Sequence, residues 1–210
     1  MKINISQLGK RYNREWIFRH FDYTFHAGEA YAILGSNGSG KSTLLQVIAG
    51  NQMASEGSIQ YFYNEKSIAV EKIFQHLSLA TPYLELVEEY TLIEAIEFHK
   101  QFKAFVNELS SKEIIEICEL EKARDKEIKY FSSGMKQRVR LVLAILSNTP
   151  LLLLDEPTSN LDKKGQNWYA QLMQNYSANR IVLVCSNHQM QEYDFCSKLI
   201  EIEDYKLAKA

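Results

Sequence analysis

The chain has 210 residues and a formal net charge of −2, which fits one compact domain. Its hydrophobic fraction of 46% and charged fraction of 24% are those of a globular protein and exclude disordered and fibrous chains. The charge is balanced and lacks the basic excess that is typical of nucleic-acid-binding proteins. No apolar run approaches the ~18 residues of a membrane-spanning helix. Three cysteines without C-x-x-C spacing favour a reducing compartment over a disulfide framework or a zinc site.

The first third of the chain is predicted to be mainly β structure. Phe21, Tyr23 and Phe25 alternate with polar residues, at the period of a half-buried strand. We expect the sheet around residues 2–30 to be antiparallel. An apolar strand over 30–34 then enters a glycine-rich turn, and a helix over 42–49 follows, ended by Gly50. Two short strands are predicted over 58–63 and 76–80.

The middle of the chain is predicted to be helical, and in the last part strands are predicted to alternate with helices. Ser110 and Glu113 have the spacing of a capping box, and Pro150 disfavours helix at the residue before it. The expected elements are helices over about 91–101, 114–120 and 133–147, a strand over 151–154, a helix over 165–177, a strand over 181–185, a short helix over 189–195 and a strand over 198–203. This alternation indicates an α/β sheet. We expect a single domain over 1–210, with a helical subdomain of about 82–148 inserted.

The pattern G-x-x-x-x-G-K-[ST] of a phosphate-binding loop occurs between a predicted strand and a predicted helix. It is matched by Gly35-Ser36-Asn37-Gly38-Ser39-Gly40-Lys41-Ser42-Thr43. The glycines allow backbone N–H groups to approach phosphate oxygens, and the helix N-terminus adds a partial positive charge. Lys41 supplies a full charge for the β- and γ-phosphates, and the Ser42 hydroxyl suits Mg²⁺. Residues 35–43 are therefore predicted to bind a nucleotide.

Two carboxylates follow a fully apolar strand. Asp155 and Glu156 come directly after Leu151–Leu154, and the carboxyl ends of parallel strands form the edge of a sheet where ligands bind. Asp155 is predicted to hold Mg²⁺ through water. Glu156 is predicted to orient the attacking water or accept its proton.

These motifs and the segments around them resemble the ATP-binding cassette (ABC) family, the ATPase subunits of ABC transporters. Phe131–Arg138 resembles the family signature L-S-G-G-Q followed by Q-R, Ser159–Asp162 its D-loop, and Ser186–His188 its switch. The resemblance covers essentially the whole chain. It implies a P-loop NTPase (RecA-like) core, with an N-terminal antiparallel β subdomain and an inserted helical subdomain.

The resemblance also implies a mechanism. Two cassettes pack head to tail, and ATP lies between the phosphate loop of one and the signature of the other. Ser132 and the Gly134 amide then contact the γ-phosphate across the interface. His188 forms a hydrogen bond with that phosphate and senses it. Tyr12 stands where the family has an aromatic that stacks on adenine, although packing in the core or on an edge strand is an alternative for this tyrosine.

The chain departs from the family at two places. In the signature, Ser133 replaces a glycine and Met135 replaces the glutamine. In the loop that leads into the helical insert, Ala80 or Thr81 stands where the family has a glutamine that contacts Mg²⁺ and the membrane partner. Either Thr81 partly substitutes for that glutamine at the metal or a water molecule does.

The function predicted from the sequence is an ATP-hydrolysing transport subunit that works with a separate transmembrane permease. It would act as a homodimer on the cytoplasmic, inner face of the cell membrane, reach the membrane only through the permease, and bind no nucleic acid. The docking surface would lie over Pro82–Thr91, with exposed Tyr83, Glu85, Glu88 and Glu89. The alternative is a soluble ABC-type ATPase in a non-transport assembly complex. The short segment after about residue 204 argues against members with a C-terminal regulatory domain.

Overall fold

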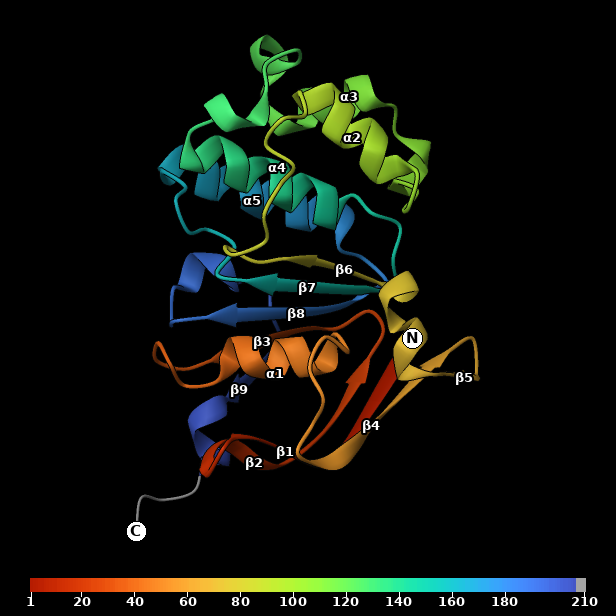
Figure 1. Cartoon of the computed structure of the whole chain (residues 1–210), viewed down its shortest axis with the longest axis vertical. Coiled ribbons are helices and arrows are strands. Elements are labelled where there is room, and N and C mark those ends of the chain that lie inside the picture. The colour runs from red at the N-terminus through yellow and green to blue at the C-terminus, as the bar shows by residue number, and fades with distance from the viewer. Residues whose placement is uncertain (207–210) are drawn as a thin grey trace.

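Two sheets form the framework of the computed structural model, which describes residues 1–206 (Figure 1). Residues 207–210 of the expected domain lie outside the described residues. The antiparallel sheet has the order β2-β1-β4-β5, with β1 Lys2–Tyr12, β2 Glu15–His26, β4 Glu56–Tyr63 and β5 Lys66–Ile68. The parallel sheet has the order β6-β7-β8-β3-β9, with β6 Leu77–Ala80, β7 Leu151–Asp155, β8 Ile181–Ser186, β3 Ala30–Leu34 and β9 Lys198–Glu201.

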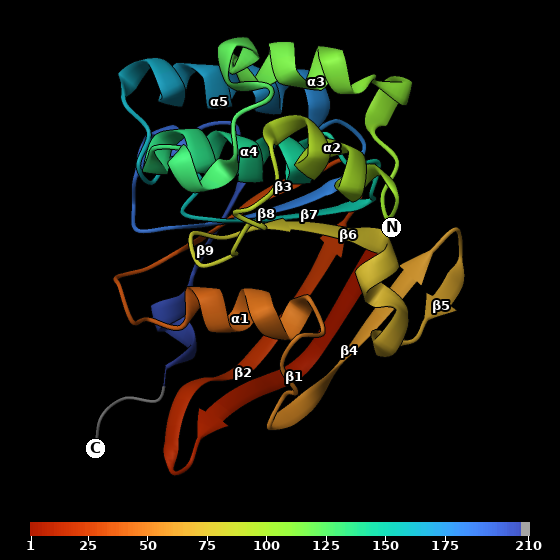
Figure 2. The same cartoon turned by 45° about the horizontal axis from the view of Figure 1, so that its top comes forward.

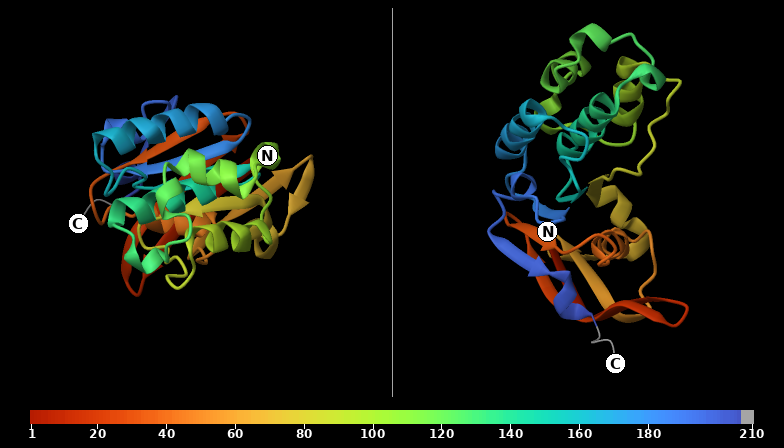
Figure 3. Two further views of the ribbon diagram at one scale, coloured as in Figure 1. Left: turned by 90° about the horizontal axis from the view of Figure 1, so that it is seen from above. Right: turned by 90° about the vertical axis from the view of Figure 1, so that its left-hand side faces the viewer.

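Helices cover the parallel sheet on both faces. The helices are α1 Lys41–Ile48, α2 Leu92–Lys100, α3 Ser111–Cys118, α4 Ser133–Ile145 and α5 Lys163–Tyr176. Figures 1 and 2 show α4 and α5 over one face, with α2 and α3 on the same side, while α1 and the antiparallel sheet lie on the other. Seen from the side, the helical region and the antiparallel sheet form opposite ends of the molecule (Figure 3). Within residues 1–206, no helix combines the length and apolarity needed to cross a membrane.

The parallel sheet separates two hydrophobic cores, because successive residues of a strand point to opposite faces. In β7, Leu152 and Leu154 belong to the core shared with the helices α2–α5. Leu151 and Leu153 belong to the core shared with α1 and the antiparallel sheet. All four leucines are fully buried, which explains why this strand reads as a continuous apolar run.

All the expected elements but one are present, with small differences at their ends. α3 begins with the predicted capping box of Ser110 and Glu113, and α2 begins with a second one, of Thr91 and Glu94, that the sequence analysis did not identify. The prediction of a short helix over 189–195 is wrong. Only a 3₁₀ turn forms, over Met190–Glu192, because the Glu192 side chain is buried and bonds to neighbouring segments, as described below. The last strand also ends early and continues as a 3₁₀ turn over Ile202–Tyr205.

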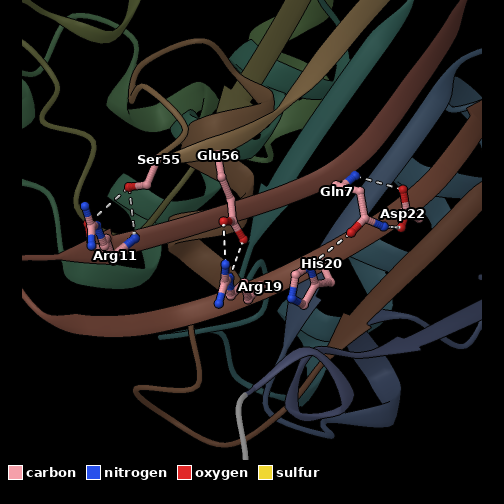
Figure 4. A network of polar contacts seen from close by, with 7 residues as sticks. All are labelled: Gln7, Arg11, Arg19, His20, Asp22, Ser55 and Glu56. Carbon is pink, nitrogen blue, oxygen red and sulfur yellow. Dashed lines mark hydrogen bonds and ion pairs between the residues drawn. The ribbon is translucent and has the colours of Figure 1, made fainter.

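A polar network braces the outer part of the antiparallel sheet (Figure 4). Gln7 in β1 and His20 in β2 have left-handed backbones, with φ of 48° and 56°, and they lie where the pairing of the two strands shifts. Asp22 accepts a hydrogen bond from the Gln7 amide at 2.8 Å. Arg19 donates two hydrogen bonds to Glu56, at 2.6 and 3.0 Å, and holds the pKa of that carboxyl below its usual value. Shifts of pairing of this kind are typical of β-bulges, which increase the local twist of a sheet.

Candidate active site

The phosphate loop connects β3 to α1 in the order that the sequence predicts. Its glycines have backbones that favour glycine, with φ of 152° at Gly35, 76° at Gly38 and 110° at Gly40. A Cβ at Gly40 would lie 2.6 Å from Cγ2 of Ile17. Only a residue without a side chain fits there, so β2 packs directly against the loop.

The lysine of this loop is buried and bonded to the loop itself. Lys41 is 4% exposed, and its Nζ donates hydrogen bonds to the carbonyl oxygens of Gly35 at 2.8 Å and Ser36 at 3.0 Å. The ammonium group therefore stays inside the loop with its donors partly satisfied.

A carboxylate from the end of the chain holds the same part of the loop. Oε1 of Glu203 accepts hydrogen bonds from the N–H and the hydroxyl of Ser36, each at 2.9 Å. A Cβ at Gly35 would lie 2.5 Å from Oε2 of Glu203, so the carboxylate rests against the loop. Burial acts to raise the pKa of Glu203, but the hydrogen bonds from Ser36 outweigh it, and the pKa lies below its usual value.

The two predicted carboxylates lie at the carboxyl end of β7, beside the phosphate loop. Asp155 is 3% exposed. Burial raises its pKa, whereas a hydrogen bond from Ser42 and the charge of Lys41 oppose that rise. Among residues 1–206, its Oδ1 finds no hydrogen-bond partner. Glu156 has a left-handed backbone, with φ of 45°, a strained conformation typical of functional sites.

A cavity of about 290 Å³ joins these two parts of the site. Its lining residues come from the phosphate loop, β2, the loop after β6 and the end of β7: Ile17, Asn37, Gly38, Gly40, Lys41, Ser42, Thr43, Pro82, Tyr83, Asp155 and Glu156. Glu156 and Asn37 also line a second cavity, of about 280 Å³, together with Thr158, Ser159, Gln166, Asn187, Gln189, Gln191 and Glu192. A triphosphate held by the loop would thus meet both carboxylates.

The signature residues lie outside both cavities, at the start of α4. Ser132 is the N-cap of this helix and accepts a hydrogen bond from the Met135 amide at 3.3 Å. A Cβ at Gly134 would lie 3.0 Å from the carbonyl oxygen of Asn160, so the signature packs against the D-loop of the same chain. Met135, which departs from the family pattern, packs against the hydrophobic core.

His188 and Tyr12 do not line the cavity around Lys41 either. His188 has φ of 52°, and its half-exposed ring lies with Nε2 3.8 Å from Glu201. Tyr12 ends β1 and donates its hydroxyl to Gln52 at 2.6 Å, and Lys10 lies over its ring at 5.1 Å from the centroid. The aromatic and apolar residues that do line the cavity are Ile17, Pro82 and Tyr83, and none of them was predicted from the sequence to bind nucleotide.

The two residues considered for the glutamine position differ in their surroundings. Ala80 pairs with Leu154 across β6 and β7 and belongs to the core under the helices. Thr81 follows it, is 6% exposed, and comes level with Asp155 as the chain leaves the sheet. The residues of this loop that line the cavity with both carboxylates are Pro82 and Tyr83, whereas Thr81 is buried directly before them.

Two buried polar residues near the site were missed. Gln137 in α4 is 1% exposed and donates a hydrogen bond to the carbonyl oxygen of Pro157 at 2.9 Å. Glu192 is 2% exposed and bonds to Thr158 and Ser186. No local pattern separates such residues from exposed ones, although Gln137 does fall within the signature segment.

Comparison with known proteins agrees with this geometry. The family model described as ABC transporter matches residues 18–159. The chain is 28% identical over 208 residues to the uncharacterized ABC transporter ATP-binding protein YybJ of Bacillus subtilis (strain 168), over 98% of this chain and 94% of that protein. It is 26% identical over 205 residues to the Nod factor export ATP-binding protein I of Rhizobium johnstonii, over 96% of this chain and 66% of that protein.

A solved structure extends the comparison to the fold. The dimeric structure of a post-hydrolysis state of the ATP-binding cassette MJ0796, bound to ADP and Pi, has a TM-score of 0.83 and 23% identity, over 99% of this chain and 97% of that chain. The two chains therefore share one fold over nearly their whole length. The chain therefore belongs to the ABC transporter family, within which it is an ATP-binding and ATP-hydrolysing cassette.

Proposed function

We propose that this chain binds ATP with Mg²⁺, hydrolyses it as a dimer, and thereby energises a separate transmembrane permease. The observation that carries the proposal is the single cavity that brings Lys41 and Ser42 of the phosphate loop together with Asp155 and Glu156. A nucleotide held there has a cation for its phosphates and a carboxylate for the attacking water.

The residues present fit a magnesium ion. Asp155 is buried, and its Oδ1 lacks a hydrogen-bond partner among residues 1–206, while Ser42 lines the same cavity. Mg²⁺ prefers oxygen ligands, takes few of them from protein and keeps several waters. Ser42 would bind it directly and Asp155 through water. When bound, it neutralises charge on the β- and γ-phosphates.

The chain's own side chains then have distinct tasks. Lys41 leaves the carbonyl oxygens of Gly35 and Ser36 and forms hydrogen bonds with phosphate oxygens. Glu156 orients the attacking water and accepts its proton. His188 donates a hydrogen bond to the γ-phosphate and senses its presence. Tyr12 stacks on the adenine, and Ile17 contacts the nucleotide from β2. Every other residue of the 35–43 loop, from Gly35 to Thr43, binds phosphate through its backbone or shapes the loop that does.

The position of the signature supports a dimer. Ser132 and Gly134 lie at the N-terminus of the 13-residue helix α4, which suits an anion, yet neither lines the cavities of their own chain. In a head-to-tail pair, they would contact the γ-phosphate bound by the partner. ATP then closes the dimer because it contacts both halves only in the closed state, and hydrolysis removes that link.

The docking surface for the permease is the loop between β6 and α2, at the border of the helical subdomain of residues 82–148. Tyr83 is 87% exposed, and Glu85, Glu88 and Glu89 are exposed beside it. Attachment at this loop would hold the chain on the inner face of the membrane. The transport-related names of the relatives favour this function over a soluble assembly ATPase.

The test compares the wild-type chain with the Glu156→Gln variant. We expect Mg²⁺-dependent phosphate release from ATP by the wild type, and ATP-dependent dimers without phosphate release in the variant. Equal phosphate release by both would overturn the assignment of Glu156. Co-purification from detergent-solubilised membranes with a polytopic protein is expected for the transport function, and recovery only in a soluble complex would reject it.

A further inference from the structure

The carboxylate of Glu192 joins two segments of the active site. Its Oε1 accepts hydrogen bonds from the backbone N–H of Thr158 at 3.1 Å and from the Thr158 hydroxyl at 2.9 Å. Its Oε2 accepts a hydrogen bond from the Ser186 hydroxyl at 2.5 Å. The backbone of Glu192 is fixed as well, since Tyr169 of α5 donates a hydrogen bond to its carbonyl oxygen at 3.0 Å.

The two segments are those that carry the proposed reacting groups. Thr158 lies two residues after Glu156, and Ser186 lies two residues before His188. Glu156 and His188 both have left-handed backbones, with φ of 45° and 52°. Residues other than glycine keep such conformations only where their surroundings hold them. Glu192 forms hydrogen bonds with a residue close to each of them, Thr158 and Ser186.

Burial of the Glu192 carboxylate costs free energy, and no ion pair with a cationic side chain offsets that cost. Glu192 is 2% exposed, and within the described part of the chain no lysine, arginine or histidine forms an ion pair with it. Burial raises its pKa, and the hydrogen bonds with Ser186 and Thr158 act against that rise. A carboxylate can accept hydrogen bonds on two oxygens, which lets one side chain join two loops.

The position of Glu192 also relates it to the nucleotide. It lines the cavity of about 280 Å³ that Glu156, Asn37 of the phosphate loop and Asn187 of the switch also line. A change in the shape of this side chain therefore alters the space between the catalytic turn and the switch.

We propose that Glu192 is a positioning residue for ATP hydrolysis, which fixes Glu156 and His188 relative to each other by bonding to the segment that carries each. This inference rests on the proposed function and deepens it. Glu192 acts through these two residues and does not touch the phosphates.

The test is steady-state ATP hydrolysis by the full chain with two substitutions at this position. Glu192→Gln keeps an acceptor for Thr158, and its amide can donate to the Ser186 hydroxyl, so we expect kcat within about threefold of wild type. Glu192→Ala removes both links, and we expect kcat to fall on the order of 10- to 100-fold with KM for ATP nearly unchanged, as misplaced reacting groups do.

A double-mutant comparison separates positioning from general loss of structure. In a His188→Ala background, part of what Glu192 positions is already gone, so Glu192→Ala is expected to lower kcat by a smaller factor than in the wild type. An equal factor in both backgrounds would overturn the inference, and so would a wild-type kcat in Glu192→Ala.

Milder variants serve if Glu192→Ala does not fold. Ser186→Ala removes the link to the switch, and Thr158→Val removes one of the two hydrogen bonds to the catalytic turn. Each is expected to lower kcat severalfold at constant KM, measured well below the melting temperature of each variant, and unchanged kcat in both would contradict the inference. If the wild-type chain shows no hydrolysis that depends on Glu156, the proposed function and this inference are both overturned. If the wild type is active and Glu192→Ala is equally active, this inference alone is overturned.

Discussion

Asp155 and Glu156 are neighbours in the chain, yet their surroundings give them different chemistry. Asp155 ends β7, is buried against the phosphate loop and is suited to a cation. Glu156 has already left the strand, and its left-handed backbone turns it toward both cavities. The boundary between strand and turn therefore separates the proposed metal ligand, Asp155, from the proposed base, Glu156.

A pair of substitutions tests this division. Glu156→Gln is expected to lower kcat by about 10²-fold or more with ATP binding retained, because the amide cannot accept the proton. Thr81→Gln is expected to leave ATP turnover within a few-fold of wild type, because it introduces the residue that the family has at this position. The measurement is phosphate release with nucleotide binding as control, and equal losses in both variants would contradict the placement of Thr81.

His99 provides a prediction about pH. Burial lowers the pKa of His99 to about 4, and Ser147 and Phe105 surround the ring. In the unfolded chain, His99 is protonated with the ordinary pKa of about 6.5. Between about pH 4 and pH 6.5, the unfolded state therefore binds more protons than the folded state. Stability attributable to His99 is therefore present above about pH 6.5 and is lost as the pH falls toward 4.

The matched variant is His99→Gln, which can keep a hydrogen bond to Ser147 and does not titrate. Between pH 7 and pH 5, wild type is expected to lose on the order of 1–2 kcal/mol more unfolding free energy than the variant. Urea unfolding at the two pH values measures this. Parallel losses in both proteins would show that the ring is not the titrating group.

Among the elements, α3 shows how far a local pattern determines structure. Ser110 accepts a hydrogen bond from the Glu113 amide at 3.3 Å, and Glu113 accepts one from the Ser110 amide at 2.8 Å. Ser110→Ala is expected to lower the free energy of unfolding by about 1 kcal/mol. Chemical denaturation measures the effect, with Ser67→Ala at an exposed strand position as control. An equal change in both variants would mean that the cap contributes nothing.

The elements also show which features could be predicted from sequence. The phosphate loop, the apolar strand before Asp155 and the cap at Ser110 are local patterns, and the structure contains each. The turn at Met190–Glu192 could not be predicted, because it depends on bonds from Glu192 to residues 34 and 6 positions away. The contact of Gln137 with Pro157 spans 20 positions, so it too depends on the tertiary fold.

Over the whole molecule, hydrogen bonds link the loop between β6 and α2 to the turn after β7 through α4. Arg140 donates a hydrogen bond to the carbonyl oxygen of Leu84 at 2.7 Å and another to Gln137 at 3.4 Å. Gln137 in turn donates to Pro157, directly after Glu156. Lys136 forms an ion pair with Glu88 in the same loop. These bonds form a continuous connection from the loop between β6 and α2 to the segment that holds Glu156.

The link predicts a change in local stability. Arg140→Ala is expected to increase hydrogen exchange of the amides over residues 83–88 several-fold, because one of their attachments to α4 is lost. Exchange in β7 is expected to stay as in wild type, and Lys163→Ala at an exposed position of α5 is the control. Unchanged exchange over 83–88 would show that Arg140 does not hold the loop.

The bonds of Lys41 to its own loop make nucleotide binding an exchange of partners. Each phosphate oxygen that reaches the ammonium replaces a carbonyl oxygen of Gly35 or Ser36, so the net gain is smaller than the contact alone suggests. Glu203 keeps those carbonyls in place from the other side through Ser36. In the proposed function, a bound phosphate would therefore compete with two carbonyl oxygens of the loop for the single ammonium group of Lys41.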